Sequence, residues 1–242
     1  MVTPEGAALG VIDAGIWARG PKDEAPVKES TRWVEGYEIV ADLASQVPDT
    51  RLVYGADREG DLRALRDAAA RRGTPADWLV RATHNRHTTA GEKVWDRLAW
   101  TEPLGAVEFR LPAAPGRPAR MVRQTLYREP VTLPARNGTP ALPVTAILAR
   151  EEHPPAGEKA IEWRLLTNRV AETLEAVVEL INWYRRRWRI EIYQPYNLRK
   201  TLLMINGWWR AIARYGWRLA LLVAFPTQPH RLGSATADAP AG

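Results

Sequence analysis

Residues 184–191, with the sequence YRRRWRIE, set one carboxylate among four arginines. The carboxylate is Glu191, and Arg187 and Tyr184 precede it at helical spacing. Such a group suits Mg²⁺ beside a phosphate backbone, because proteins hold Mg²⁺ with one or two carboxylates plus substrate phosphates. It equally suits an ordinary surface pair between Arg187 and Glu191, worth about 0.3–0.5 kcal/mol. Both interpretations remain open on this motif alone.

A second candidate carboxylate, Asp57, ends the apolar run TRLVYGAD at 50–57 and is followed by REGD. If this run is a buried strand, Asp57 lies at the carboxyl edge of a sheet, where α/β proteins commonly bind ligands. Aspartate is also a favoured cap for a helix that begins directly after it. Asp57 is therefore either a site residue or a helix cap.

The other residue types that carry chemistry narrow the class of protein. The histidines, His84, His87, His153 and His230, lack the spacing of a zinc site. The sequence contains no cysteine, which excludes disulfides, thiol catalysis and thiolate metal ligands. It also lacks the P-loop, GxGxxG and GxSxG motifs of nucleotide-binding proteins and hydrolases. Trp163, in the run IEWRLLTN, is either a core residue or a platform for a ligand ring.

The elements that must position Asp57 alternate between helix and strand. A strand-like run occupies 8–18, and a helix is predicted over 32–46. Strands are predicted at 50–57 and 77–83. Between them, apolar residues recur at helical spacing over 58–73 and stop at a glycine, which predicts a second helix.

The segment that must position Glu191 follows a block of different character. From 87 to 168, short β-like runs are separated by turns rich in proline and glycine. A helix is then predicted over 171–193. At about 100° per residue, Tyr184, Arg187 and Glu191 share one stripe at the rim of the buried face, whereas Arg186 points away. The buried stripe itself is predicted to comprise Leu174, Val177, Ile181, Trp188 and Ile192.

The charge of the chain favours a polyanionic partner. The formal net charge is +6 and the isoelectric point about 9.8. Most of the positive charge is arginine, which grips phosphate in a bidentate manner. The apolar run LALLVAF at 219–225 is too short to cross a bilayer, so no membrane partner is expected.

Taken together and in order, these motifs resemble cut-and-paste bacterial transposases of the insertion-sequence-four type. Tyr184, Arg187 and Glu191 match the first three members of that family's Y-(2)-R-(3)-E-(6)-K signature. The run YGADREGDL resembles the strand that carries the second acidic residue of the family's DDE triad. DWLVRAT, a β-rich stretch, EWRLLTN and the helix with Y, R and E follow in the family's order. The resemblance spans roughly residues 8 to 193.

This resemblance implies an α/β fold, with an RNase H-like mixed-sheet core and a β-rich insertion before the last catalytic helix. The first part of the core is expected at 1–86 and the insertion at 87–168. The catalytic helix that completes the core is expected at 169–200. A divergent and partly disordered tail is expected at 201–242.

The resemblance also implies the chemistry. Asp57 and Glu191 would be catalytic, as two of three carboxylates that hold a pair of Mg²⁺ or Mn²⁺ ions for cleavage of transposon ends and strand transfer. The residues expected to contact DNA are Tyr184, Arg187, Arg81 and Trp163, the last by stacking on a flipped base. The implied partners are double-stranded DNA and a second or full-length transposase chain, in the bacterial cytoplasm at the nucleoid.

Three departures from the family pattern predict an incomplete copy that is inactive by itself. No aspartate before Asp57 has the context of the triad's first member. Leu198 stands where the signature has lysine, and Pro195 breaks a helix soon after Glu191. The alternative functions are a non-catalytic DNA-binding fragment and an RNase H-like nuclease that acts without transposition.

Overall fold

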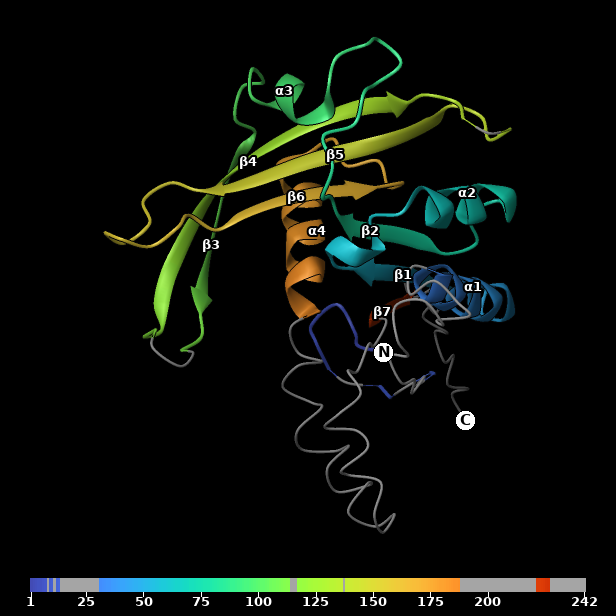
Figure 1. Ribbon diagram of the computed structural model, residues 1–242. Coiled ribbons are helices and arrows are strands. Elements are labelled where there is room, and N and C mark those ends of the chain that lie inside the picture. The colour runs from blue at the N-terminus through green and yellow to red at the C-terminus, as the bar shows by residue number, and fades with distance from the viewer. Residues whose placement is uncertain are drawn as a thin grey trace, which may run out of the picture.

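One sheet joins all the strands of the part of the chain that the structure describes (Figure 1). The computed structural model describes residues 1–7, 9–10, 12–13, 31–113, 117–136 and 138–187, together with the backbone of 221–226. The helical elements are α1 (Thr31–Gln46), η1 (Arg58–Gly60), α2 (Arg63–Arg71), α3 (Val94–Leu98) and α4 (Leu174–Arg186). The strands are β1 (Thr50–Ala56), β2 (Asp77–Arg81), β3 (Gly105–Leu111), β4 (Arg120–Leu133), β5 (Leu142–Glu151), β6 (Glu162–Thr167) and β7 (Leu221–Pro226).

The sheet is mixed, which confirms the predicted α/β class. Its strand order is β3-β4-β5-β6-β2-β1-β7. β1 and β2 run parallel, with Ala56 opposite Val80, and the other neighbouring strands pair antiparallel. Because β6 pairs with both β5 and β2, the β-rich block at 87–168 continues the sheet of the first segment.

Described helices cover both faces of the sheet, α4 on one and α1, α2 and α3 on the other (Figure 1). Side chains alternate across the strands, so Tyr54 joins the core under α1, α2 and α3 while Val53 joins the core under α4. On the α4 side, Val177 and Ile181 are fully buried against Leu79 of β2 and its neighbours. Both residues belong to the predicted buried stripe, whose period is that of a helix with one face in the core.

The predicted elements agree with the structure at 32–46, 50–57 and 77–83, which form α1, β1 and β2. The helix predicted over 58–73 is wrong in its first turns, because η1 and α2 are separate. Gly60 lies where the chain turns under α1, and a Cβ there would approach the Ala56 Cβ to 2.4 Å. This close approach fixes a turn that helical periodicity does not reveal.

The last predicted helix is described only in part. Thr173 caps α4 by accepting a hydrogen bond from the backbone N–H of Ala176 at 3.3 Å. The remainder of 171–193 after Arg187, including Trp188 and Ile192, lies outside the described residues, as does most of the strand-like run at 8–18. Within the tail expected at 201–242, β7 pairs with β1 as an edge strand. None of the described helices has the length and apolar character needed to span a membrane.

Candidate functional site

Asp57 is directed at α4 and does not cap the helical turn that follows it. Its backbone occupies the N-cap position of η1, but its side chain makes no capping hydrogen bond. One carboxylate oxygen accepts a hydrogen bond from the Tyr184 hydroxyl at 3.2 Å, and the other lies 3.2 Å from Nη2 of Arg187. Arg81 Nη1 lies 3.8 Å from the same carboxylate. The interpretation of Asp57 as a helix cap is therefore wrong.

Four of the sequence-predicted site residues thus meet at one place. Asp57 follows β1 and Arg81 ends β2, and the two strands are parallel neighbours, so their carboxyl ends lie at the same edge of the sheet. Tyr184 and Arg187 come from the end of α4, and Tyr184 is 127 positions from Asp57. The helix reaches this edge because its apolar stripe packs across β1, β2 and β6.

Tyr184 joins the core to the site. The structure buries its ring, which is 1% exposed and packs edge-on against Trp163 at 5.5 Å, so the expected position at a rim holds for its hydroxyl alone. Burial raises the pKa of the phenol above its ordinary value, and the charge of Asp57 adds to this against opposing effects of Arg187 and Arg81. The hydroxyl therefore stays protonated near neutral pH and donates its hydrogen bond to Asp57.

The charged groups of the site remain accessible from outside. The side chain of Asp57 is 35% exposed, that of Arg187 18% and that of Arg81 20%. A carboxylate is a hard oxygen ligand of the kind that Mg²⁺ takes, and here it lies against two guanidinium groups. The guanidinium groups can in turn bind phosphate, since each carries five N–H donors.

Trp163 is a core residue, and the expectation that it stacks on a flipped base is not met by its surroundings. Its side chain is 2% exposed, and its ring stacks on Phe109 with the centroids 5.4 Å apart. A base has almost no indole surface to stack on in this arrangement. The core interpretation of Trp163, which the sequence left open, is confirmed.

Of the two carboxylates that the sequence predicts as metal ligands, the structure describes one, Asp57. Glu191 lies outside the described residues, so its distance from Asp57 is not defined. Within the part of the chain that the structure describes, no three His, Asp or Glu side chains gather as a metal cluster. Asp57 fits a ligand for Mg²⁺ or Mn²⁺ by its chemistry and exposure, and the role of Glu191 as a second ligand stays a prediction.

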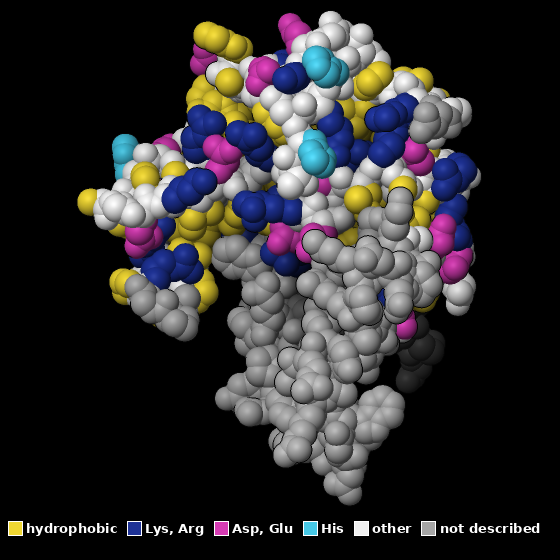
Figure 2. Space-filling view, in the orientation of Figure 1, with side chains coloured by type: hydrophobic (Ala, Val, Ile, Leu, Met, Phe, Trp, Pro, Cys, Tyr) yellow, Lys and Arg dark blue, Asp and Glu magenta, His cyan; other side chains and the backbone are white. Residues whose placement is uncertain are grey.

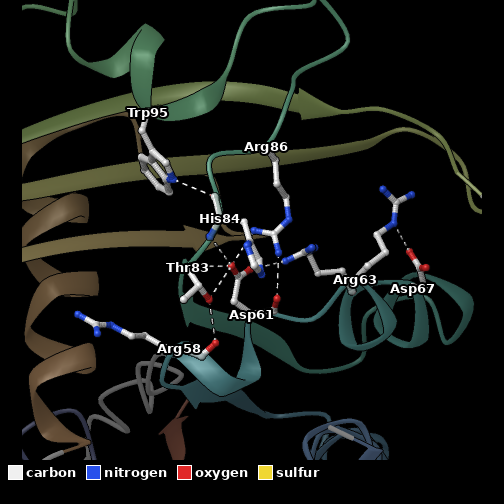
Figure 3. A network of polar contacts seen from close by, with 9 residues as sticks. Arg58, Asp61, Arg63, Asp67, Thr83, His84, Arg86 and Trp95 are labelled. Carbon is white, nitrogen blue, oxygen red and sulfur yellow. Dashed lines mark hydrogen bonds and ion pairs between the residues drawn. The ribbon is translucent and has the colours of Figure 1, made fainter.

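Asp61, which the sequence analysis did not single out, holds the turn after Asp57 in place (Figure 3). Its side chain is fully buried and pairs with Arg66 at 2.9 Å and Arg86 at 2.7 Å. It also accepts hydrogen bonds from the backbone N–H groups of Thr83 at 2.7 Å and His84 at 3.3 Å. Because Thr83 and His84 closely follow Arg81, Asp61 ties the turn beside Asp57 to the segment beside Arg81.

No local signal distinguishes Asp61 from any aspartate near the start of a helix. Its importance arises from partners on α2 and on the segment after β2, which the turn at Gly60 brings together. The spacing of residues in the sequence does not reveal the pair between Asp61 and Arg86, because the two residues are 25 positions apart.

A comparison of the chain with models of known protein families found none that matches.

Proposed function

We propose that this chain is an incomplete DDE transposase with an RNase H-like core, in which Asp57 is a metal-binding carboxylate at the DNA-cutting site. One observation carries the proposal: Tyr184, Arg187 and Arg81 all surround Asp57. The resemblance to transposases selected these residues by their sequence motifs alone, and they meet although they come from separate elements. A cap residue or a surface ion pair does not require such a meeting.

The arrangement suits work on a phosphodiester. Arg187 and Arg81 would hold phosphate oxygens next to Asp57, and Tyr184 would fix the orientation of the carboxylate through its hydrogen bond. A bound Mg²⁺ or Mn²⁺ ion would supply an activated water and stabilise negative charge on the attacked phosphate. Asp57 and Glu191 are the residues of this chain that would hold the ion.

DNA binding without cleavage is a second candidate function, and the ion pairs favour it. The Asp57 carboxylate is already engaged by Arg187 and by the Tyr184 hydroxyl, so it is neutralised without a metal ion. In-line displacement calls for a clamp on both the attacking and the leaving oxygens, which two carboxylates provide poorly. We expect the purified chain to bind duplex DNA and not to cut it.

The charge of Asp57 gives a direct test of the proposed site. In the absence of divalent metal, Asp57→Ala should bind duplex DNA several-fold more tightly than the parent chain, because Arg187 and Arg81 lose a competing carboxylate. Asp67→Ala, which removes the same charge from the Arg63 pair on α2, is the matched control and should change the affinity little. Fluorescence anisotropy at constant ionic strength measures both.

Equal affinities for the two variants would place the DNA away from Asp57 and overturn the proposal. Nicking of supercoiled plasmid with Mg²⁺ or Mn²⁺ separates the two candidate functions. Metal-dependent nicking that disappears in Asp57→Ala and persists in Asp67→Ala would show that the chain contains a complete nuclease site. Another residue would then supply the third metal ligand.

A further inference from the structure

A pocket of about 670 Å³ beside the Asp57 site is lined by basic side chains from separate parts of the chain. Its cations are Arg58, Arg81, Arg117, Arg150, Lys159 and Arg164. They belong to η1, the end of β2, the segment before β4, and the β5–β6 hairpin. Lys and Arg side chains are spread across the face of the molecule seen in the space-filling view (Figure 2). Arg81 borders both places, since it also faces Asp57.

Three of these cations are not neutralised by the rest of the described chain. Arg58, Arg117 and Lys159 form no side-chain hydrogen bond or ion pair with any described residue. The Nε atom of Arg117 is buried and has no hydrogen-bond partner among them. The charges of Arg58, Arg117 and Lys159 are therefore available to an anion that enters the pocket.

Glu162, the acidic residue of the pocket lining, does not neutralise the charge of these three cations. Its carboxylate pairs with Arg150 and Arg164, each at 2.8 Å. Burial alone would raise the pKa of Glu162, but these two arginines outweigh burial and hold it below its ordinary value. Glu162 is thus committed to its own partners, and the pocket retains a large excess of positive charge.

We propose that this pocket binds the phosphate groups of a single nucleic-acid strand that leads away from the Asp57 site. The choice of nucleic acid as the anion rests on the proposed function, whereas the affinity for phosphate rests on the lining alone. The two strands of a duplex cannot enter a pocket of this volume, but about one or two nucleotides of a single strand fit.

Recognition in this pocket is through phosphate and is independent of base sequence. Proteins that grip bases in a single strand stack them on exposed aromatic rings. The aromatic residue in this lining is Trp163, whose ring is 2% exposed and already packed on Phe109. Arginine, the main cation here, binds phosphate oxygens in a bidentate manner and does not require a particular base.

The test removes two of the unpartnered cations. Arg117→Ala with Lys159→Ala should lower the affinity for a fluorescent single-stranded oligothymidylate by on the order of tenfold, in buffer without divalent metal. The slope of log K against log salt should fall by about 1.4, the value for two lost phosphate contacts on a single strand. Neither substitution removes a side-chain hydrogen bond or ion pair within the described residues, so the fold should persist, as a thermal melt will verify.

The matched control is Lys93→Ala with Arg136→Ala, which changes the same charge at two exposed positions outside the pocket. It should leave strand affinity within about threefold, because distant charges act only through screened solvent. Equal losses in both double variants would overturn the proposal and indicate a diffuse basic surface.

Inorganic pyrophosphate and ATP distinguish a strand from a free phosphate compound. If either displaces the oligonucleotide at a concentration equal to the strand's own dissociation constant, the pocket binds small phosphates and the strand assignment is wrong. These measurements use no metal and no duplex. A failure of the Asp57→Ala test would therefore overturn the proposed function while leaving the strand-binding pocket supported.

Discussion

At the scale of single residues, the environment of a side chain decides between interpretations that its type leaves open. Asp57 and Asp61 are four positions apart on either side of Gly60, yet one is partly exposed beside α4 and the other is fully buried. Trp163 and Tyr184 are both core residues, but the Tyr184 hydroxyl reaches the site. Burial and partners, more than residue type, therefore assign the roles.

The two neighbouring arginines at the end of α4 allow a residue-scale prediction. Arg187 faces Asp57, whereas Arg186 donates a hydrogen bond from Nε to the backbone oxygen of Pro4 at 3.2 Å. Arg187→Ala should weaken duplex binding and reduce the slope of log K against log salt by about 0.9, the value for one phosphate contact. Arg186→Ala should change the slope much less. Titration of duplex DNA at several salt concentrations measures both.

The fold of either variant should be little affected, since both side chains lie at the partly exposed end of the helix. If Arg186→Ala reduces the salt slope as much as Arg187→Ala, both arginines belong to a general basic surface, and the stripe of Tyr184 and Arg187 has no special place in DNA binding.

At the scale of elements, the site depends on how the ends of β1 and β2 are held. η1 and the segment after β2 carry Arg58 and Thr83, and both segments are tied to Asp61. A hydrogen bond from the Thr83 hydroxyl to the backbone oxygen of Arg58, at 3.0 Å, joins them directly. The helices α1 and α2 pack on this part of the sheet, on the face opposite α4. These contacts hold the carboxyl ends of β1 and β2 next to each other.

Removal of the Asp61 charge should therefore cost much of the stability of the fold. Asp61→Asn leaves Arg66, whose side chain is 1% exposed, without its carboxylate, and breaking a buried pair in this way costs about 3–5 kcal/mol. Asp67→Asn is the control, because its pair with Arg63 is a more exposed i,i+4 contact worth about 0.3–0.5 kcal/mol. Urea unfolding followed by tryptophan fluorescence gives both free energies of unfolding.

If Asp61→Asn and Asp67→Asn lose similarly small amounts of stability, the ion pairs of Asp61 are not needed to stabilise the fold. The ends of β1 and β2 would then be positioned by the sheet register and the apolar cores alone.

At the scale of the whole molecule, a continuous sheet connects the site to the β-rich block. β6 lies between β2 and β5, so the strand that carries Trp163 and Glu162 is also the neighbour of the strand that ends at Arg81. Arg81 donates a hydrogen bond to the backbone oxygen of Glu162 at 3.2 Å, which fixes the site against this block. The basic pocket lies where these parts meet.

The distance between Asp57 and Glu191 is the prediction that belongs to this scale. The proposed function requires the two carboxylates within about 12 Å, the reach of metal ligation through water. The chain has no cysteine, so in a double variant with Asp57→Cys and Glu191→Cys the spin labels attach at these two positions only. Dipolar broadening of the electron paramagnetic resonance spectrum should show a short distance between them.

The pair Asp57→Cys and Glu175→Cys is the control. Glu175 lies in the first turn of α4, about 18 Å along the helix from Arg187 at 1.5 Å per residue. A Glu191 label that is as far from position 57 as the Glu175 label would exclude a shared metal site and, with it, the transposase assignment.

The local patterns of the sequence determined most of the elements and the choice of candidate residues. Periodicity predicted α1, β1, β2 and the buried face of α4, because a helix or strand with one face in the core repeats its apolar residues locally. Motif spacing drew attention to Asp57, Tyr184 and Arg187. The function assigned to them stays a prediction.

Only the tertiary structure decided which of these residues meet. Asp57 and Tyr184 are 127 positions apart, and their contact depends on the parallel pairing of β1 with β2 and on the packing of α4 across both. The same holds for the buried Asp61 and for the basic pocket, whose members come from distant segments. Local periodicity reports which face of an element is apolar, but strand order and long-range packing determine which side chains share a place, and no local pattern encodes these.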